Sequence, residues 1–410
     1  MKRLFLRLFL LFMLTAFPAL AADFAAGLRA FDRGDYATAR QEWNPLAEQG
    51  NAEAQSFLGM MYDQGQGVPQ DYKEAGKWLR LAAEQGNVAA QNNLAAWLEK
   101  VKDAPPDYKE AAKWRRLAAE QGNAEAQYHL GLMHAQGKGV PRDDEEAVKL
   151  FRLAAEQQYA PAASGLGFMY LNGRGVTLNQ EEALKWFHIA AEQEDAEAQY
   201  NLGKMHEIGQ SVTKDYEEAL KWFRLAANQK NADAQYSLGK MYAKGLGVPQ
   251  DHMEAVKWRR LAAEQGNAGF QLELGEIYEK GQGVPQDQIE AVKWYRLAAE
   301  QGNLQAQNNL GFKHYIGNGI PQNYKEAAKW HQLAAEQGDV HAQYNLGVAY
   351  DNGEGVARDD IAAHMWYNLA ASQSNDKAKK NRDAIEKRMP AADIATAQER
   401  AREWTKKHGK

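Results

Sequence analysis

Cysteine is absent from the 410-residue sequence, which excludes disulfide bonds and thiolate-ligated metal sites. Positive charge is not in excess either, because 49 Lys and Arg residues stand against 54 Asp and Glu residues, a formal net charge of −5. A chain with this balance has no basic field to attract nucleic acid or an anionic membrane surface. We therefore expect neither as a partner.

Long apolar runs are also scarce, apart from one at the N-terminus. Lys2, Arg3 and Arg7 precede an apolar stretch from Leu8 to Phe17, and Ala19-Leu20-Ala21 follows it. This order of charge, apolar core and small residues is typical of a secretory signal peptide. An uncleaved anchor is the alternative, but the stretch is shorter than the roughly 20 residues that span a bilayer.

We therefore predict a signal peptide over residues 1–21, cleaved after Ala21. The mature protein is then periplasmic or secreted, without membrane insertion after cleavage.

A strict 36-residue period occupies most of the chain. It runs through nine copies without insertion, over residues 52–375, and the copies begin at Ala52, Val88, Ala124, Ala160, Ala196, Ala232, Ala268, Leu304 and Val340. A fixed period of this length indicates a solenoid in which each unit buries its apolar face against its neighbours.

Each copy is predicted to contain two antiparallel helices. In the first copy Ala54, Leu58 and Met61 recur at helical spacing, and Gly65-Gln66-Gly67 ends that helix. Asp71 then stands at the N-cap of a second helix, whose buried face is predicted to comprise Ala75, Trp78, Leu81 and Ala82.

Glycine and tryptophan recur in fixed places of this frame. Gly59 and its equivalents lie in a helix interior, where glycine costs about 1 kcal/mol relative to alanine, so we expect close backbone approach there. Trp78 and its equivalents lie beside Ala-Ala pairs, and we expect them to be core residues rather than ligand platforms. In the second copy Ala95 replaces the glycine, and we expect irregular geometry near Val101–Pro106.

This pattern resembles the Sel1-like repeat family, a relative of the tetratricopeptide repeat. The A-x-x-x-L-G-x-x-Y-x-x-G-x-G-V run of the family stands at Ala232 to Val248, and its second half matches Ala255, Trp258, Ala262 and Ala263. The resemblance implies an all-α, right-handed αα superhelical solenoid whose first helices line a concave surface that binds partners.

The segments on either side of the repeats are predicted to cap the ends of the solenoid. Residues 22–51 are expected to form an N-terminal helix pair, and residues 376–410 a C-terminal pair with a polar outer face. A basic docking patch is the alternative for the C-terminal segment.

Motifs with chemical meaning are isolated. Ser237 and Lys240 form an S-x-x-K string, but no S-D-N or K-T-G element accompanies it. His206-Glu207 begins an H-E-x-x-H motif, but Gln210 occupies the second ligand position. We therefore expect a non-catalytic protein without metal or cofactor. A cell-wall-active or β-lactam-binding protein on the same repeat is the alternative.

Specificity should lie where the first helices differ from one another. By the resemblance, their variable residues face the concave surface, and the candidate binding residues are Tyr128, Leu132, Phe168, Leu171, Tyr200, Lys204, Tyr236, Lys240, Asn308, Phe312, Ile316 and Tyr344. The four tyrosines share one position, where they either contact a ligand or pack against the next repeat. The mixture of apolar, aromatic and charged residues favours a protein or peptide partner, bound by a monomer.

Overall fold

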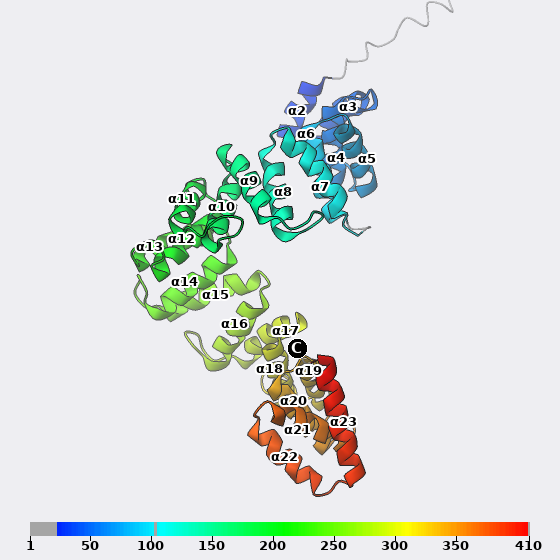
Figure 1. Cartoon of the computed structure of the whole chain (residues 1–410), viewed down its shortest axis with the longest axis vertical. Coiled ribbons are helices and arrows are strands. Elements are labelled where there is room, and N and C mark those ends of the chain that lie inside the picture. The colour runs from blue at the N-terminus through cyan, green and yellow to red at the C-terminus, as the bar shows by residue number, and fades with distance from the viewer. Residues whose placement is uncertain (1–22, 102–104, 409–410) are drawn as a thin grey trace, which may run out of the picture. The chain divides into compact units, whose positions relative to one another are not determined.

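The computed structural model describes residues 23–101 and 105–408, and this part of the chain is entirely helical, with no strand. The predicted signal peptide lies outside the described residues. The described residues divide into two compact units between Ala198 and Gln199. Figure 1 labels the helices of both. Each unit is a stack of helix pairs, so the predicted all-α repeat fold is confirmed.

In the first unit a short pair, α2 (Phe24–Asp32) and α3 (Tyr36–Glu48), precedes the repeats. Four repeat pairs follow, and their helices are α4 (Ala52–Gln64), α5 (Tyr72–Glu84), α6 (Val88–Lys100), α7 (Tyr108–Glu120), α8 (Ala124–Gln136), α9 (Asp144–Glu156), α10 (Ala160–Asn172) and α11 (Gln180–Glu192). Each helix packs against the next one in the sequence.

Helix α12 (Ala196–Ile208) begins at the end of the first unit, and most of it belongs to the second. The other repeat helices of the second unit are α13 (Tyr216–Asn228), α14 (Ala232–Lys244), α15 (His252–Glu264), α16 (Ala268–Lys280), α17 (Gln288–Glu300), α18 (Leu304–Ile316), α19 (Tyr324–Glu336), α20 (Val340–Asn352) and α21 (Asp360–Ser372). The chain ends in α22 (Asp376–Glu386) and α23 (Ala391–His408).

The helix ends follow from the repeated turn residues. The Asn51 side chain accepts a hydrogen bond from the Ala54 amide at 2.8 Å, and Asp71 accepts one from the Glu74 amide at 3.0 Å. Gly65 ends α4 in the left-handed conformation, with φ of 68°. In the second repeat no glycine is available, and α6 ends instead at an extended Val101, with ψ of 128°. The helix end at Val101 therefore departs from the other repeats, as expected; residues 102–104 of the segment Val101–Pro106 lie outside the described residues.

The glycine inside the first helix, present in every repeat but the second, lies close to a side chain of the second helix and, in several repeats, also to its backbone. A Cβ on Gly239 would lie 2.9 Å from the Ala255 carbonyl oxygen, so the expected close backbone approach is found there. A Cβ on Gly131 would lie 2.7 Å from the Phe151 ring, and one on Gly275 would lie 2.6 Å from the Tyr295 ring. The side chain concerned belongs to the residue after the tryptophan position. The largest of these residues are almost fully buried: Phe151, Phe187, Phe223, Tyr295 and Tyr367. They fill the centre of the helix pair, while Trp114, Trp294, Trp330 and Trp366 are buried and the other repeat tryptophans are half-buried.

The prediction that Leu81 is buried is wrong. Its side chain is 39% exposed, and the equivalent residues are exposed as well: Leu117, Leu153, Ile189, Leu225, Leu261, Leu297 and Leu333. Leu81 lies one turn from Trp78, at the outer edge of the apolar face, where no neighbouring helix covers it. Leu369, at the same position in the ninth repeat, is only 4% exposed because it joins a core cluster with Ala401 and Trp404 of α23.

A ladder of buried glutamines joins consecutive repeats. Gln271 donates from Nε2 to the Ala263 carbonyl of the preceding repeat at 3.2 Å and accepts from Gln301 at 2.7 Å. Equivalent contacts recur through both units. The fourth repeat is the exception, because Ala163 occupies the glutamine position. Unpaired buried amides and carbonyls are costly, so the ladder fixes the register of each joint.

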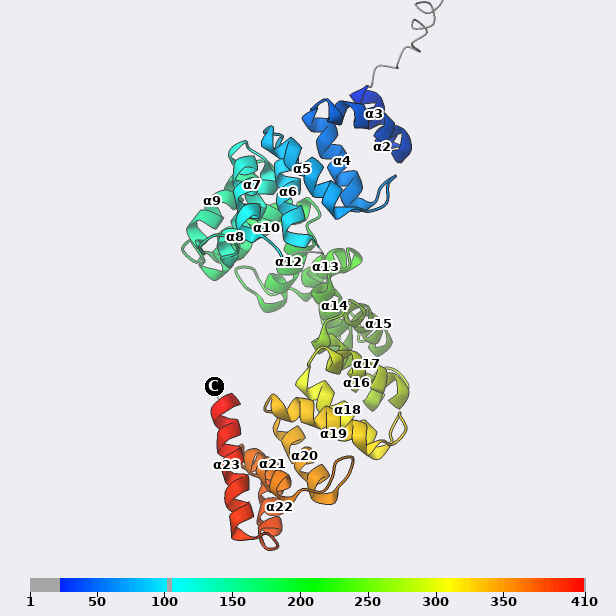
Figure 2. The same ribbon diagram turned by 90° about the vertical axis from the view of Figure 1, so that its right-hand side faces the viewer.

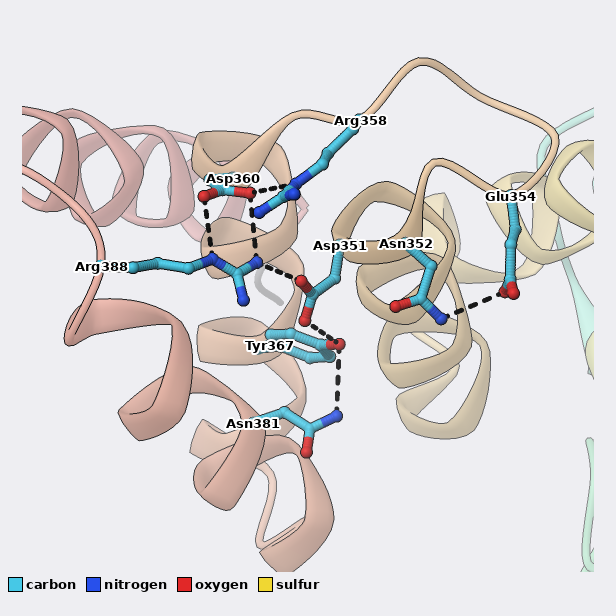
Figure 3. Close-up of polar contacts among 8 residues, drawn as sticks. All are labelled: Asp351, Asn352, Glu354, Arg358, Asp360, Tyr367, Asn381 and Arg388. Carbon is cyan, nitrogen blue, oxygen red and sulfur yellow. Dashed lines mark hydrogen bonds and ion pairs between the residues drawn. The ribbon is translucent and has the colours of Figure 1, made fainter.

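The C-terminal helices close the second unit. Helix α23 lies beside α21 (Figure 2), with the Trp366 and Trp404 rings 6.2 Å apart and edge to face. Arg388, between α22 and α23, pairs with Asp360 at 3.0 Å and with Asp351 (Figure 3). Tyr367 donates to Asp351 and accepts from Asn381, both at 3.2 Å. These contacts bind the terminal helices to the ninth repeat.

Candidate binding notches between repeats

Three pockets occupy the same place in the repeat frame. Each is bounded by the two helices of one repeat and by the first helix of the next, a space that we call a notch. Notch 1 lies between the first and second repeats, with a volume of 380 Å³; notch 2 lies between the second and third, with 270 Å³; notch 8 lies between the eighth and ninth, with 200 Å³. Notches 1 and 2 belong to the first unit and notch 8 to the second.

The residue after the tryptophan position differs between the repeats of these notches and the repeats that carry Phe or Tyr there. In repeats with Phe or Tyr there, the ring is almost fully buried under the glycine of the first helix. In the three notches that position holds Leu79, Arg115 and His331, and each of these side chains lines its pocket. Leu79 is shorter than a ring and Arg115 is directed to Glu99, whereas the His331 ring lies against Gly311 as the Phe and Tyr rings lie against their glycines.

Notch 1 has a mixed lining. Trp97 packs on Gly76, where a Cβ would lie 2.6 Å from its ring, and it shares the pocket wall with Met60. Asp63 and Lys100 supply one charge of each sign. Burial raises the pKa of Asp63 above its ordinary value, against the opposing effect of Lys100. The lining of the pocket therefore combines charged and apolar side chains.

Notch 2 is the most highly charged of the three. The Arg115 guanidinium is 4% exposed and donates from Nη2 to Glu99 at 3.1 Å, while its Nε is buried without a partner. Lys100 and Lys138 add two cations, and Leu132 is an apolar wall. Burial, with the charges of Arg115 and Lys100, lowers the pKa of His129, another lining residue, to about 4.

Notch 8 is mainly aromatic. Phe312 is 48% exposed at its mouth, and the Tyr315 and Tyr324 rings meet edge to face at 5.3 Å. His331 lies at the base, 3% exposed and with no partner for its Nδ1. Burial lowers the pKa of His331 to about 4, so the imidazole is neutral near pH 7.

The structure brings only some predicted residues into notches. Leu132 lines notch 2, and Phe312 and Tyr344 line notch 8. Phe168 and Ile316 are exposed, as expected for contact residues, at 46% and 43%. The remaining predicted residues are half-buried and line none of these three pockets: Tyr128, Leu171, Tyr200, Lys204, Tyr236, Lys240 and Asn308.

The tyrosines have clear packing partners. Tyr236 stacks on Phe270 of the next repeat with ring centroids 4.5 Å apart, and its hydroxyl donates to Glu273 at 2.5 Å. Burial and this carboxylate raise the pKa of Tyr236 to about 12. Tyr128 contacts the rings of Phe151 and Tyr159 at 5.6 and 5.5 Å. Packing therefore accounts for much of the side-chain surface at these two positions.

Tyr200 and Tyr344 also lie near rings of the second helices, 5.8 Å from Phe223 and 6.0 Å from Tyr367 respectively. Among the polar candidates, Lys204 pairs with Glu207 at 2.6 Å, and Asn308 accepts from Asn345 at 3.1 Å.

Sequence reasoning missed the residues at the base of the notches. Arg115 and His331 lie on second helices, which we expected to contribute only framework. The available signal was a polar residue directly after tryptophan, at a position where other repeats have Phe or Tyr. Variation at that position, and not only on the first helices, accompanies these three notches, but Arg259 shows it in the sixth repeat and lines none of them.

The S-x-x-K string lies in an unfavourable place for chemistry. Ser237 is 3% exposed within α14, and the Lys240 ammonium lies over the Tyr236 ring at 5.5 Å. Among the described residues, no cluster of three or more His, Asp or Glu side chains is arranged to hold a metal ion. No helix in residues 23–101 or 105–408 is long and apolar enough to cross a membrane.

Comparison with solved structures identifies similar repeat proteins. The crystal structure of c5321, a protective antigen present in uropathogenic Escherichia coli strains and displaying an SLR fold, is 30% identical. The match covers 90% of this chain and 94% of that chain with a TM-score of 0.54. A Sel1 repeat protein from Oxalobacter formigenes is 33% identical over 75% of this chain and 89% of its own, with a TM-score of 0.52.

No match was found among the curated proteins. The sequence profile described as Sel1 repeat matches nine consecutive segments, residues 52–87, 88–123, 124–159, 160–195, 196–231, 232–267, 269–303, 304–339 and 340–375. These segments coincide with the helix pairs from α4 to α21. The chain belongs to the Sel1 repeat family.

Proposed function

We propose that this protein is an exported, non-catalytic scaffold that binds a segment of another protein at its inter-repeat notches. The observation that carries the proposal is the recurrence of the open notch at one place in the frame, with a different lining each time. Within the first unit, notches 1 and 2 are consecutive sites of different chemistry. Such a pair suits an extended peptide, whose successive side chains differ.

Notch 8 is the best-defined part of this surface. Phe312 is almost half exposed beside Tyr344, and an exposed aromatic group next to a pocket is typical of a contact site. The cavity of 200 Å³ has the size of a large side chain rather than of a substrate. We therefore propose that it accepts one apolar side chain of the partner.

Export is proposed on the N-terminal sequence alone. The order of Lys2, Arg3 and Arg7, the apolar stretch and Ala19-Leu20-Ala21 supports cleavage after Ala21. Determination of the N-terminal residue of the protein recovered from the producing cell tests this directly. Recovery with Met1 intact would contradict it.

The binding role is tested with two matched variants. Phe312→Ala removes the exposed ring at notch 8, whereas Leu333→Ala removes a side chain that is 39% exposed on the second helix α19. Purified protein and both variants are used to capture partners from envelope extract and culture supernatant, followed by mass spectrometry. We expect Phe312→Ala to lose proteins that the wild type and Leu333→Ala retain. The same set of captured proteins for all three would overturn the proposal for notch 8.

A further inference from the structure

Notch 2 has a local charge opposite to that of the whole chain. Arg115, Lys100 and Lys138 face a pocket with a single acidic lining residue, Glu99, whereas the chain as a whole carries −5. The lysines are exposed, so they contribute mainly attraction at a distance. The buried charge of this pocket is Arg115, which pairs with Glu99 through Nη2 but has no acceptor for its Nε.

Arg115 is only partly satisfied by its own protein. A guanidinium has five N–H donors, and the contact to Glu99 at 3.1 Å uses one of its terminal nitrogens. The residue is only 4% exposed, and its buried Nε has no acceptor. A buried, half-paired guanidinium is costly, and an acceptor that enters the pocket relieves that cost.

The rest of the pocket selects what accompanies the acceptor. Leu132 and Met133 from α8 form an apolar wall, and the Tyr108 ring lies opposite Lys138, whose ammonium is 5.8 Å from the ring centroid. An inorganic anion would leave this apolar wall exposed to water. An organic acid can place its carboxylate at Arg115 and its apolar part against the wall.

We propose that notch 2 is a carboxylate subsite, in which Arg115 binds an acidic group of the partner segment next to an apolar side chain. The proposal rests on the binding role proposed above and names the chemistry of one notch. It also assigns Glu99 a role, because this carboxylate occupies Arg115 and competes with the incoming one. Glu99 therefore lowers the affinity of the site for an acidic group.

A pair of small probes tests the subsite on the purified protein. N-acetyl-L-phenylalanine carries a carboxylate beside an apolar ring, and N-acetyl-L-phenylalaninamide has the same shape without the charge. Binding is followed through the Arg side-chain Nε–Hε resonances of the ¹⁵N-labelled protein. We expect the acid to shift the Arg115 resonance saturably and the amide to leave it unchanged. Equal shifts with both probes, or none with either, would overturn the proposal.

Variants separate the subsite from general effects. Arg115→Gln should abolish acid binding, whereas Glu99→Gln should tighten it roughly tenfold by removing a like charge. A gain of affinity cannot come from misfolding, so this second variant keeps the test valid if Arg115→Gln is unstable. Arg259→Gln is the control, because Arg259 holds the equivalent position in the sixth repeat, pairs with Glu273 at 3.3 Å and also has an unpaired buried Nε, but lines none of the three pockets. It should leave binding unchanged.

Three results count against the carboxylate subsite: weaker binding by Glu99→Gln, wild-type binding by Arg115→Gln, or equally tight binding of inorganic phosphate. If one of these occurs while Phe312→Ala still loses its partner, only the subsite at notch 2 fails. If both fail together, the proposed binding role fails with them.

Discussion

The glutamine ladder should contribute measurably to the stability of each joint, and Gln271→Met is the change that tests it. Methionine has nearly the same length and volume as glutamine but cannot donate from its end. The substitution removes the bonds from Gln271 to the Ala263 carbonyl at 3.2 Å and from Gln301 to Gln271 at 2.7 Å. Little else changes, because Gln271 is 4% exposed and has a side chain of similar shape.

The expected cost follows from what each partner retains. The Ala263 carbonyl still accepts from the Gly266 amide at 3.0 Å, and Gln301 still donates to the Leu297 carbonyl at 3.2 Å. Neither group is left without a partner, so the loss is close to the net value of two hydrogen bonds, about 2 kcal/mol. Gln301→Met, at the exposed end of the pair, loses the shared bond and its own bond to Leu297. Water replaces the latter, but the buried Gln271 oxygen is left without a donor, so Gln301→Met should also cost about 2 kcal/mol.

Amide hydrogen exchange in α15, α16 and α17 is the appropriate assay, since a repeat protein can open locally rather than in one global step. The opening free energy of these helices should fall by about 2 kcal/mol in Gln271→Met, and the double variant should show coupling of about 1–2 kcal/mol. An unchanged opening free energy in Gln271→Met would refute the reasoning. So would additive effects, because the two side chains share one bond.

Three further changes test other contacts. Gly275→Ala gains about 1 kcal/mol of helix propensity but places a Cβ 2.6 Å from the buried Tyr295 ring, so we expect a net loss of roughly 1–2 kcal/mol in urea unfolding. Ala163→Gln supplies the missing amide of the ladder, and it should raise the opening free energy of α10 and α11 by about 1 kcal/mol; a decrease would show that the site lacks room. The pKa of His331 lies near 4 in the folded state and near 6.5 in the unfolded state, so the unfolded chain binds more protons at low pH. The free energy of unfolding should therefore fall by up to about 3 kcal/mol between pH 6.5 and 4. His331→Phe introduces the residue that other repeats have at this position, and it should remove that part of the pH dependence.

The period alone predicts the helices, their caps and their order, because those depend on residues within a few positions of each other. Asp71 caps α5 and Gly65 ends α4 through contacts that span a single turn. Leu81 shows where such reasoning fails. Helical spacing from Trp78 places it near the apolar face, but only the arrangement of neighbouring helices decides that it is exposed.

The candidate site was predictable in part for the same reason. Phe312 stood out as an apolar residue on a variable first helix, and it lines notch 8. The base of each notch depends on side-chain size on the second helix and on the first helix of the next repeat, which lies many residues away. Arg115 illustrates this, because its significance depends on Glu99 and on an open space that no local pattern reveals.

The spans of the ladder contacts have a consequence for how this chain can change in length. At each joint a glutamine donates to the carbonyl 8 residues before it and accepts from the glutamine 30 residues after it. Gln307, for example, donates to Ala299 and accepts from Gln337. Removal or duplication of a complete 36-residue segment between ladder-bearing repeats re-forms the same contacts at the new joint, whereas any other length breaks them. Recombination between copies can therefore add or delete notches without redesigning the fold. A joint formed with the fourth repeat would lack these bonds, because Ala163 stands at the glutamine position.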